Sequence, residues 1–208
     1  MARTGEAGAN GVSAFVVDAT TAGISFGRKE HKMGWNAQPT RAINFDQVRV
    51  PLNNLLGQEG GGFAMAMQGL DGGRINIATV GLGTAQQALN EALAYVKQRQ
   101  QFGKPIAAFQ GLQFKLADMN TELVAARQMV RLAAFKLDSK DADATTYCAM
   151  AKRFATDVGF NVCNDALQLY GGYGYIKEYP MERHVRDTRV HQILEGTNEI
   201  MRVIVSRR

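Results

Sequence analysis

Three long stretches with helical periodicity fill most of the chain after residue 63. In each stretch apolar residues recur every three or four positions, the spacing of one face of an α-helix. Phe-Gly-Lys-Pro at 102–105, a polar turn at 138–143 that ends in an expected helix N-cap, and a glycine-rich run at 171–174 separate the stretches. We therefore expect a bundle of three long antiparallel helices, followed by two short helices at about residues 180–187 and 196–206. The first stretch has its apolar residues at Ile75, Ala78, Leu82, Ala85, Leu89, Leu93 and Val96.

The first 58 residues follow a strand-like pattern instead. Short apolar runs at 13–17, 24–26 and 41–45, the last continuing into 48–50, are bounded by Gly, Asn, Asp or Pro. They predict pieces of an antiparallel sheet, which is too small to fold alone. A glycine-rich run at 57–62 marks the change. We expect a mainly α protein, with a partial antiparallel β-domain at residues 1–58 and a helical-bundle domain at 59–208.

Composition narrows the class of protein. Of the 208 residues, 46% are hydrophobic and 21% are charged, which is typical of a globular protein. No apolar run is long enough to span a bilayer, and the first residues lack the apolar core of a signal peptide. The net charge of +5 is thinly spread, which disfavours nucleic acid as a partner. We therefore expect the chain to stay in the compartment where it is made, unless a targeting segment was removed.

The cysteines and histidines indicate neither a disulfide nor a metal site. Cys148 and Cys163 fall in one expected helix, where fifteen positions at ~1.5 Å each separate them by about 22 Å, too far for a disulfide. Two unpaired cysteines fit a reducing compartment. His31, His184 and His191 share no metal-ligand spacing, so we interpret them as structural or surface residues and expect no metal.

One carboxylate near the end of the chain has an unusual setting. Glu195 lies in the stretch HQILEGTNEIMR, after the apolar pair Ile193–Leu194 and before an apolar run at 200–205. A carboxylate held against apolar neighbours loses hydration and becomes better able to take a proton from carbon. The alternative is an acidic residue placed to suit the positive end of a helix. The motif alone leaves both interpretations open.

Three other motifs are equally ambiguous by themselves. Arg99 suits either a phosphate or the negative end of a helix dipole. The glycine-rich run at 171–174 does not follow a strand, which excludes a Rossmann turn; it either ends a helix or leaves room for a ligand beside the backbone. Asp71 and Arg74 offer a charge pair beside two glycines.

Taken in order, these segments resemble the successive motifs of the acyl-CoA dehydrogenase family. The resemblance is carried by GLDGGRINIATVGLGTAQQAL, RQQFGKPIAAFQGLQFKLADM, LQLYGGYGYIKEYPMERHVRD and ILEGTNEIMR. Upstream, KMGWNAQPTRAINFDQVRVP and GQEGGGFAMAM resemble the second part of the family's middle β-domain and its entry into the C-terminal helical domain. The resemblance covers essentially the whole chain, and GWNAQPTR with GLDGGRINIA is most similar to the isobutyryl-CoA dehydrogenase branch.

The resemblance implies a reaction, a cofactor and partners. The reaction is α,β-dehydrogenation of a short or branched acyl-CoA thioester, isobutyryl-CoA-like, with FAD as hydride acceptor. An electron-transferring flavoprotein is the onward oxidant, and the family tetramer implies a homo-oligomer. Glu195 matches the family's base, and its backbone N–H is expected to hydrogen-bond the thioester oxygen. Some branches carry the base at the position of Gly73, which has no carboxylate here.

The resemblance also assigns binding roles. The positions that match FAD-binding residues of the family are Arg99, Gln101, Phe102, Gln168, Gly171, Gly172 and Thr197. The first three match residues that hold the FAD of a neighbouring subunit, and the next three match a strip along the adenosine part of that same flavin. Asp71, Arg74 and Gly196 match positions on the substrate side, and Arg74 is also able to hold the loop that carries the base. We exclude Glu199, because a carboxylate beside pyrophosphate is unfavourable unless it turns outward.

The front of the chain departs from the family pattern. The motifs of the family's N-terminal helical domain and of the first half of its β-domain do not occur here. We therefore expect the C-terminal part of an acyl-CoA dehydrogenase, with Met1 an internal start. Two interpretations follow: an enzyme whose remaining part is supplied elsewhere, or a non-catalytic helical bundle that self-associates through residues 99–104.

Overall fold

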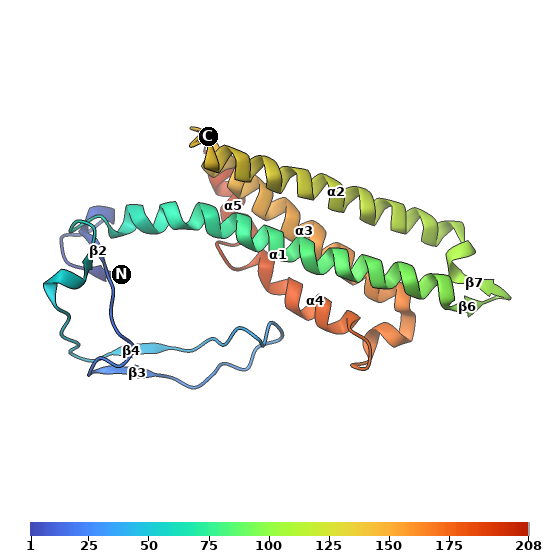
Figure 1. Ribbon diagram of the computed structural model, residues 1–208, viewed down its shortest axis with the longest axis horizontal. Helices are drawn as coiled ribbons and strands as arrows, with labels where there is room; N and C mark the ends of the chain where they lie inside the picture. Colours follow the sequence, from blue (N-terminus) through green and yellow to red (C-terminus); the bar gives the residue numbers. More distant parts are fainter. Residues whose placement is uncertain (208) are drawn as a thin grey trace. The chain divides into compact units, whose positions relative to one another are not determined.

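The computed structural model describes residues 1–207, and these form two compact units. One unit comprises residues 1–32 and 36–70, and the other comprises 33–35 and the chain from Asp71 onward. The second unit holds nearly all of the helical structure, and Figure 1 shows its long helices side by side.

The second unit is a helix bundle. Its helices are α1 (Gly62–Gln98, of which the first nine residues belong to the other unit), α2 (Gln110–Asp138), α3 (Ala144–Tyr170), α4 (Met181–Arg189) and α5 (Asn198–Ser206). Short 3-10 helices at Ile106–Ala108, Gly171–Tyr175 and Val190–Gln192 connect them. The expected three long and two short helices are therefore confirmed, with boundaries shifted by a few residues.

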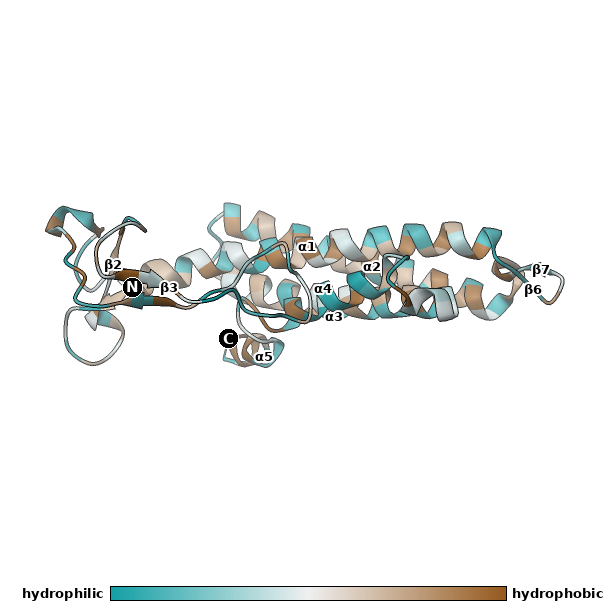
Figure 2. Ribbon diagram, turned by 90° about the horizontal axis from the view of Figure 1, so that it is seen from below, coloured by the Kyte–Doolittle hydropathy of each residue, from teal (hydrophilic) through white to brown (hydrophobic). Residues whose placement is uncertain are grey.

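The bundle core follows the helical periodicity of the sequence. Figure 2 shows hydrophobic and hydrophilic residues alternating along α1, α2 and α3, as expected for helices with one buried face. Most apolar residues of the first stretch are buried, but Leu93 is 39% exposed and Ala92 takes the buried position of that turn. The side chains with 0% exposure in this core are Ala78, Ala85, Ala88, Ala92, Val96, Leu123, Ala126, Ala133, Cys148, Ala151, Ala155, Cys163, Ala166 and Met181. Many of them are alanines, which allow helices to approach closely.

α1 and α3 approach each other closely at two glycines. A Cβ atom added at Gly159 would lie 3.1 Å from the carbonyl oxygen of Gly81 and 3.3 Å from its carbonyl carbon. Gly159 is buried, whereas Gly83 on α1 is exposed and a Cβ there would meet nothing within 4 Å. The α1–α3 contact therefore depends on the absence of a side chain at residue 159.

Two features of the sequence mark helix boundaries as expected. α1 ends before a hairpin of β6 (Gln100–Gln101) and β7 (Lys104–Pro105), whose two-residue loop is Phe102 and Gly103 with φ of 52° and 77°. Positive φ at both loop positions is the requirement of a tight hairpin turn. Asp143 is the N-cap of α3, as predicted, but its carboxylate does not cap the helix; it accepts a hydrogen bond from Lys136 Nζ at 2.8 Å.

The first unit contains two small antiparallel sheets. One has the order β1 (Ala2–Arg3), β2 (Val12–Phe15), β5 (Leu55–Leu56), and the other pairs β3 (Ile24–Phe26) with β4 (Ile43–Phe45). In the second sheet Ile24 lies opposite Phe45 and Phe26 lies opposite Ile43. The expectation of antiparallel strands is correct, but residues 48–50 are not in a strand, and β1 and β5 were not expected.

Both cysteines lie in α3, are buried and form no disulfide. Burial raises the pKa of the Cys148 thiol to about 11 and that of Cys163 to about 12, so both are protonated at neutral pH.

None of the helices in residues 1–207 is long and apolar enough to cross a membrane. Within the same residues, no His, Cys, Asp and Glu side chains are grouped as a metal ion would require.

We predict that Gly159→Val lowers the free energy of unfolding by about 1–3 kcal/mol, because the added methyl groups force α1 and α3 apart. Urea denaturation measures this value. Gly83→Val is the matched control: it places the same side chain on an exposed helical position and is expected to change stability by less than about 0.5 kcal/mol. Equal effects of the two substitutions would contradict the packing argument.

Candidate active site

Glu195 lies in a short turn between the 3-10 helix Val190–Gln192 and α5. The backbone φ of Glu195 is 57° and that of Gly196 is 88°, so two successive residues are left-handed. This conformation costs a non-glycine residue free energy, and such strain is found most often at functional sites. At Gly196 a Cβ atom would lie 2.7 Å from the terminal methyl of Met201, which would have to shift, and the positive φ itself disfavours any residue other than glycine there.

The carboxylate of Glu195 lies against Gly73 on α1. A Cβ atom added at Gly73 would be 2.5 Å from Oε2 of Glu195 and 2.9 Å from Cδ. The side chain is partly buried, and among residues 1–207 it forms no hydrogen bond or ion pair. Gly73 therefore provides the space that the carboxylate occupies.

The turn is fixed on both sides by backbone and capping bonds. Before it, the N–H groups of Ile193 and Leu194 donate to the carbonyl oxygen of Val190 at 2.9 and 3.0 Å. After it, Thr197 is the N-cap of α5 and its hydroxyl accepts a hydrogen bond from Ile200 N at 3.4 Å. The Glu195 N–H, between these anchors, has no acceptor within residues 1–207. It is therefore available to a ligand.

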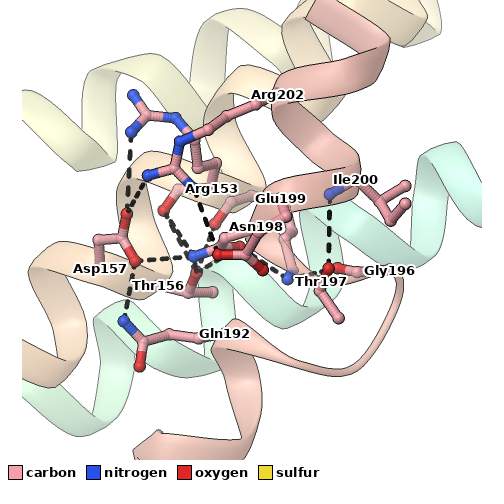
Figure 3. Close-up of polar contacts among 11 residues, drawn as sticks. Arg153, Thr156, Asp157, Gln192, Gly196, Thr197, Asn198, Glu199, Ile200 and Arg202 are labelled. Atoms are coloured by element: carbon pink, nitrogen blue, oxygen red, sulfur yellow. Dashed lines mark hydrogen bonds and ion pairs between the residues drawn. The ribbon is translucent and has the colours of Figure 1, made fainter.

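A buried polar cluster connects the turn to α3. Figure 3 shows Asn198, at the start of α5, pointing towards Thr156 and Asp157 of α3. Asn198 Nδ2 donates to Asp157 Oδ1 at 2.7 Å and to Thr156 Oγ1 at 3.0 Å. From α3, the ammonium of Lys152 donates to the Gly196 carbonyl oxygen at 2.7 Å and to Asn198 Oδ1 at 2.9 Å. Sequence analysis missed this cluster, although a lysine between Ala151 and Ala155 on an otherwise apolar helix face was a usable signal.

Asp71 and Arg74, expected on the substrate side, form an ion pair that is largely enclosed. Arg74 Nη1 donates to Asp71 Oδ1 at 2.7 Å, and Thr145 Oγ1 of α3 donates to Asp71 Oδ2 at 2.7 Å. Arg74 is 6% exposed, and its buried Nε has no partner among the described residues. The pair therefore joins α1 to α3 one residue away from Gly73.

Most of the remaining expected cofactor residues meet in a second place. A groove of about 590 Å³ is lined by Arg99, Gln101, Gln168, Gly171, Gly172 and six neighbours, including Tyr95, Tyr170 and Tyr173. The guanidinium of Arg99 lies 5.5 Å from the centre of the Tyr173 ring. Phe102, beside the groove residues in the hairpin loop, is 89% exposed.

The groove and the Glu195 turn are separate sites on this chain. In Figure 1 the β6–β7 hairpin, next to Arg99, lies at one end of the bundle and α5 lies towards the other. Thr197 is in the turn with Glu195 and not in the groove. Glu199, which the sequence analysis excluded, has an 80% exposed side chain whose carboxylate lies 3.7 Å from Arg202. It is therefore turned outward.

Comparison with known proteins identifies the family of this chain. The sequence model of the acyl-CoA dehydrogenase C-terminal domain matches residues 60–208. The chain belongs to the acyl-CoA dehydrogenase family.

Individual acyl-CoA dehydrogenase relatives match over nearly the whole chain. Mitochondrial isobutyryl-CoA dehydrogenase of Dictyostelium discoideum is 56% identical over 208 residues, which is 100% of this chain and 50% of the relative. A subunit of the caffeyl-CoA reductase–Etf complex of Acetobacterium woodii is 46% identical over 96% of this chain and 52% of the relative. The structure of butyryl-CoA dehydrogenase from Megasphaera elsdenii superposes with a TM-score of 0.91, at 47% identity over 94% of this chain and 51% of that one.

These findings confirm the family and the fold class expected from the motifs. Acyl-CoA dehydrogenases are FAD-dependent flavoproteins, in agreement with the cofactor that the resemblance implied. The chain spans about half the length of the curated relatives it matches.

His191 precedes the Glu195 turn, and its burial makes the free energy of unfolding depend on pH. The ring is 1% exposed, has no hydrogen-bond partner for either nitrogen among the described residues, and lies edge-on to Trp35 at 5.5 Å. Burial lowers the pKa of His191 below its ordinary value of 6.5; the nearby Asp187 carboxylate opposes this shift and Lys152 adds to it. The folded state therefore holds His191 neutral, whereas the unfolded state takes up a proton as pH falls through about 6.5.

We predict that this contribution to stability is fully present above about pH 6.5 and is lost below it, by at most about 1.4 kcal/mol per pH unit. Urea denaturation between pH 5 and pH 8 measures it. His191→Met should remove this component of the pH dependence, and His31→Gln, at an exposed position, should retain it. Identical pH profiles for the protein and His191→Met would contradict the assignment.

Proposed function

We propose that this chain supplies the catalytic base and part of the FAD site of an acyl-CoA dehydrogenase acting on a short, branched acyl-CoA of the isobutyryl-CoA type. The observation that carries the proposal is the setting of Glu195: a partly buried carboxylate in a left-handed turn, with no hydrogen-bond or ion-pair partner within residues 1–207, against the empty side of Gly73. The acyl group is inferred from the isobutyryl-CoA dehydrogenase of Dictyostelium discoideum.

The chemistry requires a base that is free to accept a proton from carbon. Glu195 removes the α-proton of the thioester, and its carboxylate is free to do so because it forms no hydrogen bond or ion pair with the described residues. The Glu195 N–H, which has no acceptor here, donates to the thioester oxygen and stabilises the negative charge that develops there.

The groove beside Arg99 has the donor set that an adenosine pyrophosphate needs. The Arg99 guanidinium binds phosphate oxygens in pairs, Gln101 and Gln168 offer amides, and Gly171 and Gly172 leave room for a ligand beside the backbone. FAD, when bound, accepts the β-hydrogen of the substrate as a hydride. Because this groove and Glu195 lie apart on one chain, we infer that the groove serves the FAD of a neighbouring subunit and that the protein is a homo-oligomer. The exposed Phe102 is then part of the contact between subunits.

The onward electron acceptor that we propose is an electron-transferring flavoprotein. Support comes from the Acetobacterium woodii relative, which is a subunit of a complex that contains such a flavoprotein. We propose a bacterial cytoplasmic location or, for a eukaryotic source, the mitochondrial matrix; the Dictyostelium discoideum relative is a mitochondrial protein.

We predict that the purified chain binds FAD and that the flavin absorbance near 450 nm bleaches when isobutyryl-CoA is added without oxygen. Glu195→Gln should keep the flavin spectrum and the fold but slow bleaching by about 10²–10⁴-fold, the usual contribution of a general base. Stopped-flow absorbance measures the rate. A colourless protein in excess FAD would instead support a non-catalytic bundle, and unchanged bleaching by Glu195→Gln would exclude it as the base.

The space provided by Gly73 gives a second test of the same site. We predict that Gly73→Ala slows bleaching by at least about tenfold, because its Cβ would displace the Glu195 carboxylate, while helix propensity raises stability by up to about 1 kcal/mol. Gly72→Ala is the matched control, since a Cβ at this neighbouring position on α1 meets nothing within 4 Å. Gly72→Ala should gain similar stability without loss of rate. Equal rates for both variants would contradict the role of Gly73.

A further inference from the structure

Lys152 is a fully buried lysine that contacts the turn of the proposed base. Its exposed fraction is 0%, and its ammonium donates to the carbonyl oxygen of Gly196 and to the side chain of Asn198. Lysine is almost never fully buried without a partner, because removing its charge from water is costly. The two acceptor residues flank Thr197 in the sequence, so one ammonium bonds both to the end of the turn and to the start of α5.

The position is unfavourable for a cation on general grounds. α5 begins at Asn198, and the N-terminal end of a helix carries partial positive charge, which disfavours an ammonium. Burial lowers the pKa of Lys152 to about 8; Asp157, Glu199 and Glu195 raise it, and Arg74 lowers it further. Desolvation and the helix dipole both disfavour an ammonium here, and the observed interactions that offset them are its two hydrogen bonds and the nearby carboxylates.

The hydrogen bond from Lys152 fixes the backbone conformation of the turn. Glu195 and Gly196 are both left-handed, which directs the Gly196 carbonyl towards α3. The backbone N–H groups of α3 are occupied by helical hydrogen bonds, so a side chain must supply the donor that a buried carbonyl requires. Lys152 supplies it. Without this donor, the buried Gly196 carbonyl would be unpaired, which favours rotation of its peptide group towards water. The preceding residue, Glu195, would move with it.

The same ammonium is held in place by a second set of bonds. Asn198 Oδ1 accepts from Lys152, while Asn198 Nδ2 donates to Asp157 and Thr156 of α3. Gln192, which precedes the turn, also donates to Asp157 Oδ1, at 2.8 Å (Figure 3). Both ends of the turn are thus attached to one short segment of α3, residues 152–157.

We propose that Lys152 is a positioning residue for the base: by holding the Gly196 carbonyl and Asn198, it fixes the left-handed turn that places the Glu195 carboxylate over Gly73. The expected effect on the rate of flavin bleaching rests on the proposed function. The expected effect on the conformation of the turn rests only on the hydrogen bonds of Lys152.

The test compares Lys152→Met with Lys115→Met. Methionine keeps the apolar stem of lysine and removes the ammonium, and Lys115 forms an ion pair with Asp165 of α3 at 2.6 Å that does not contact the turn. Hydrogen exchange is measured at the N–H groups of Leu194 and Met201, which donate to Val190 and Thr197 on either side of Glu195. Lys152→Met should exchange at least about tenfold faster at these amides, with amides in the middle of α2 unchanged. Lys115→Met should exchange there like the parent protein.

The kinetic arm uses the FAD-loaded protein. Lys152→Met should lower the rate of flavin bleaching by isobutyryl-CoA about 10–100-fold with KM changed less than about threefold, because a misplaced base affects the reacting step and not substrate binding. Lys152→Gln, a neutral side chain that still donates a hydrogen bond, should recover part of both effects and covers the case in which Lys152→Met does not fold.

Unchanged exchange at Leu194 and Met201 in both Lys152 variants would overturn the proposal, as would a rise in KM with kcat unchanged. If the parent protein does not bleach with isobutyryl-CoA, the proposed function fails, and the exchange comparison still decides whether Lys152 holds the turn.

Discussion

The close packing of α3 is the constraint on which the helical unit depends. α3 contacts α2, α4 and α5, and it meets α1 backbone to backbone where Gly159 faces Gly81. A helix surrounded in this way must be small and apolar on nearly all sides, which explains the many buried alanines of its sequence. A polar group on the buried side of this helix has no access to water, so it must find a partner inside the protein.

The polar segment of α3 is consequently the place where structure and proposed chemistry meet. Residues 152–157 bond to the turn at Gly196 and Asn198, and Thr145, near the start of the helix, bonds to Asp71 on α1. One helix therefore supports the turn and also binds the ion pair next to Gly73, the two features that define the position of the Glu195 carboxylate. The same helix, α3, therefore contributes both to the apolar core and to the candidate site.

Much of the fold could be predicted from the sequence, because helical periodicity reports directly on which face is buried. The prediction was less accurate where burial alone does not decide. Leu93 and Ala92 are adjacent and both apolar, and only the close approach of the helices selects the smaller residue. Residues 48–50 have strand composition, but strands need partners, and no local pattern shows where these lie.

The site was predictable in part and for a different reason. Glu195 and the Arg99 groove were found through motif resemblance, since the residues themselves allowed a structural explanation. Lys152 was not found, because a single lysine in an apolar helix looks like a solvent-exposed break in the pattern. Its role depends on a carbonyl 44 residues away in the sequence, which only the folded chain brings into contact.

The contact between Gly73 and the Glu195 carboxylate also limits how this site can evolve. The Cβ of any other residue at position 73 would lie 2.5 Å from Oε2 of Glu195, so every such side chain competes with the Glu195 carboxylate for the same space. A substitution at residue 73 therefore changes the room available to residue 195, and a substitution at residue 195 changes the room available to residue 73. The two positions are thermodynamically coupled, so the effect of changing both is not expected to equal the sum of the single effects.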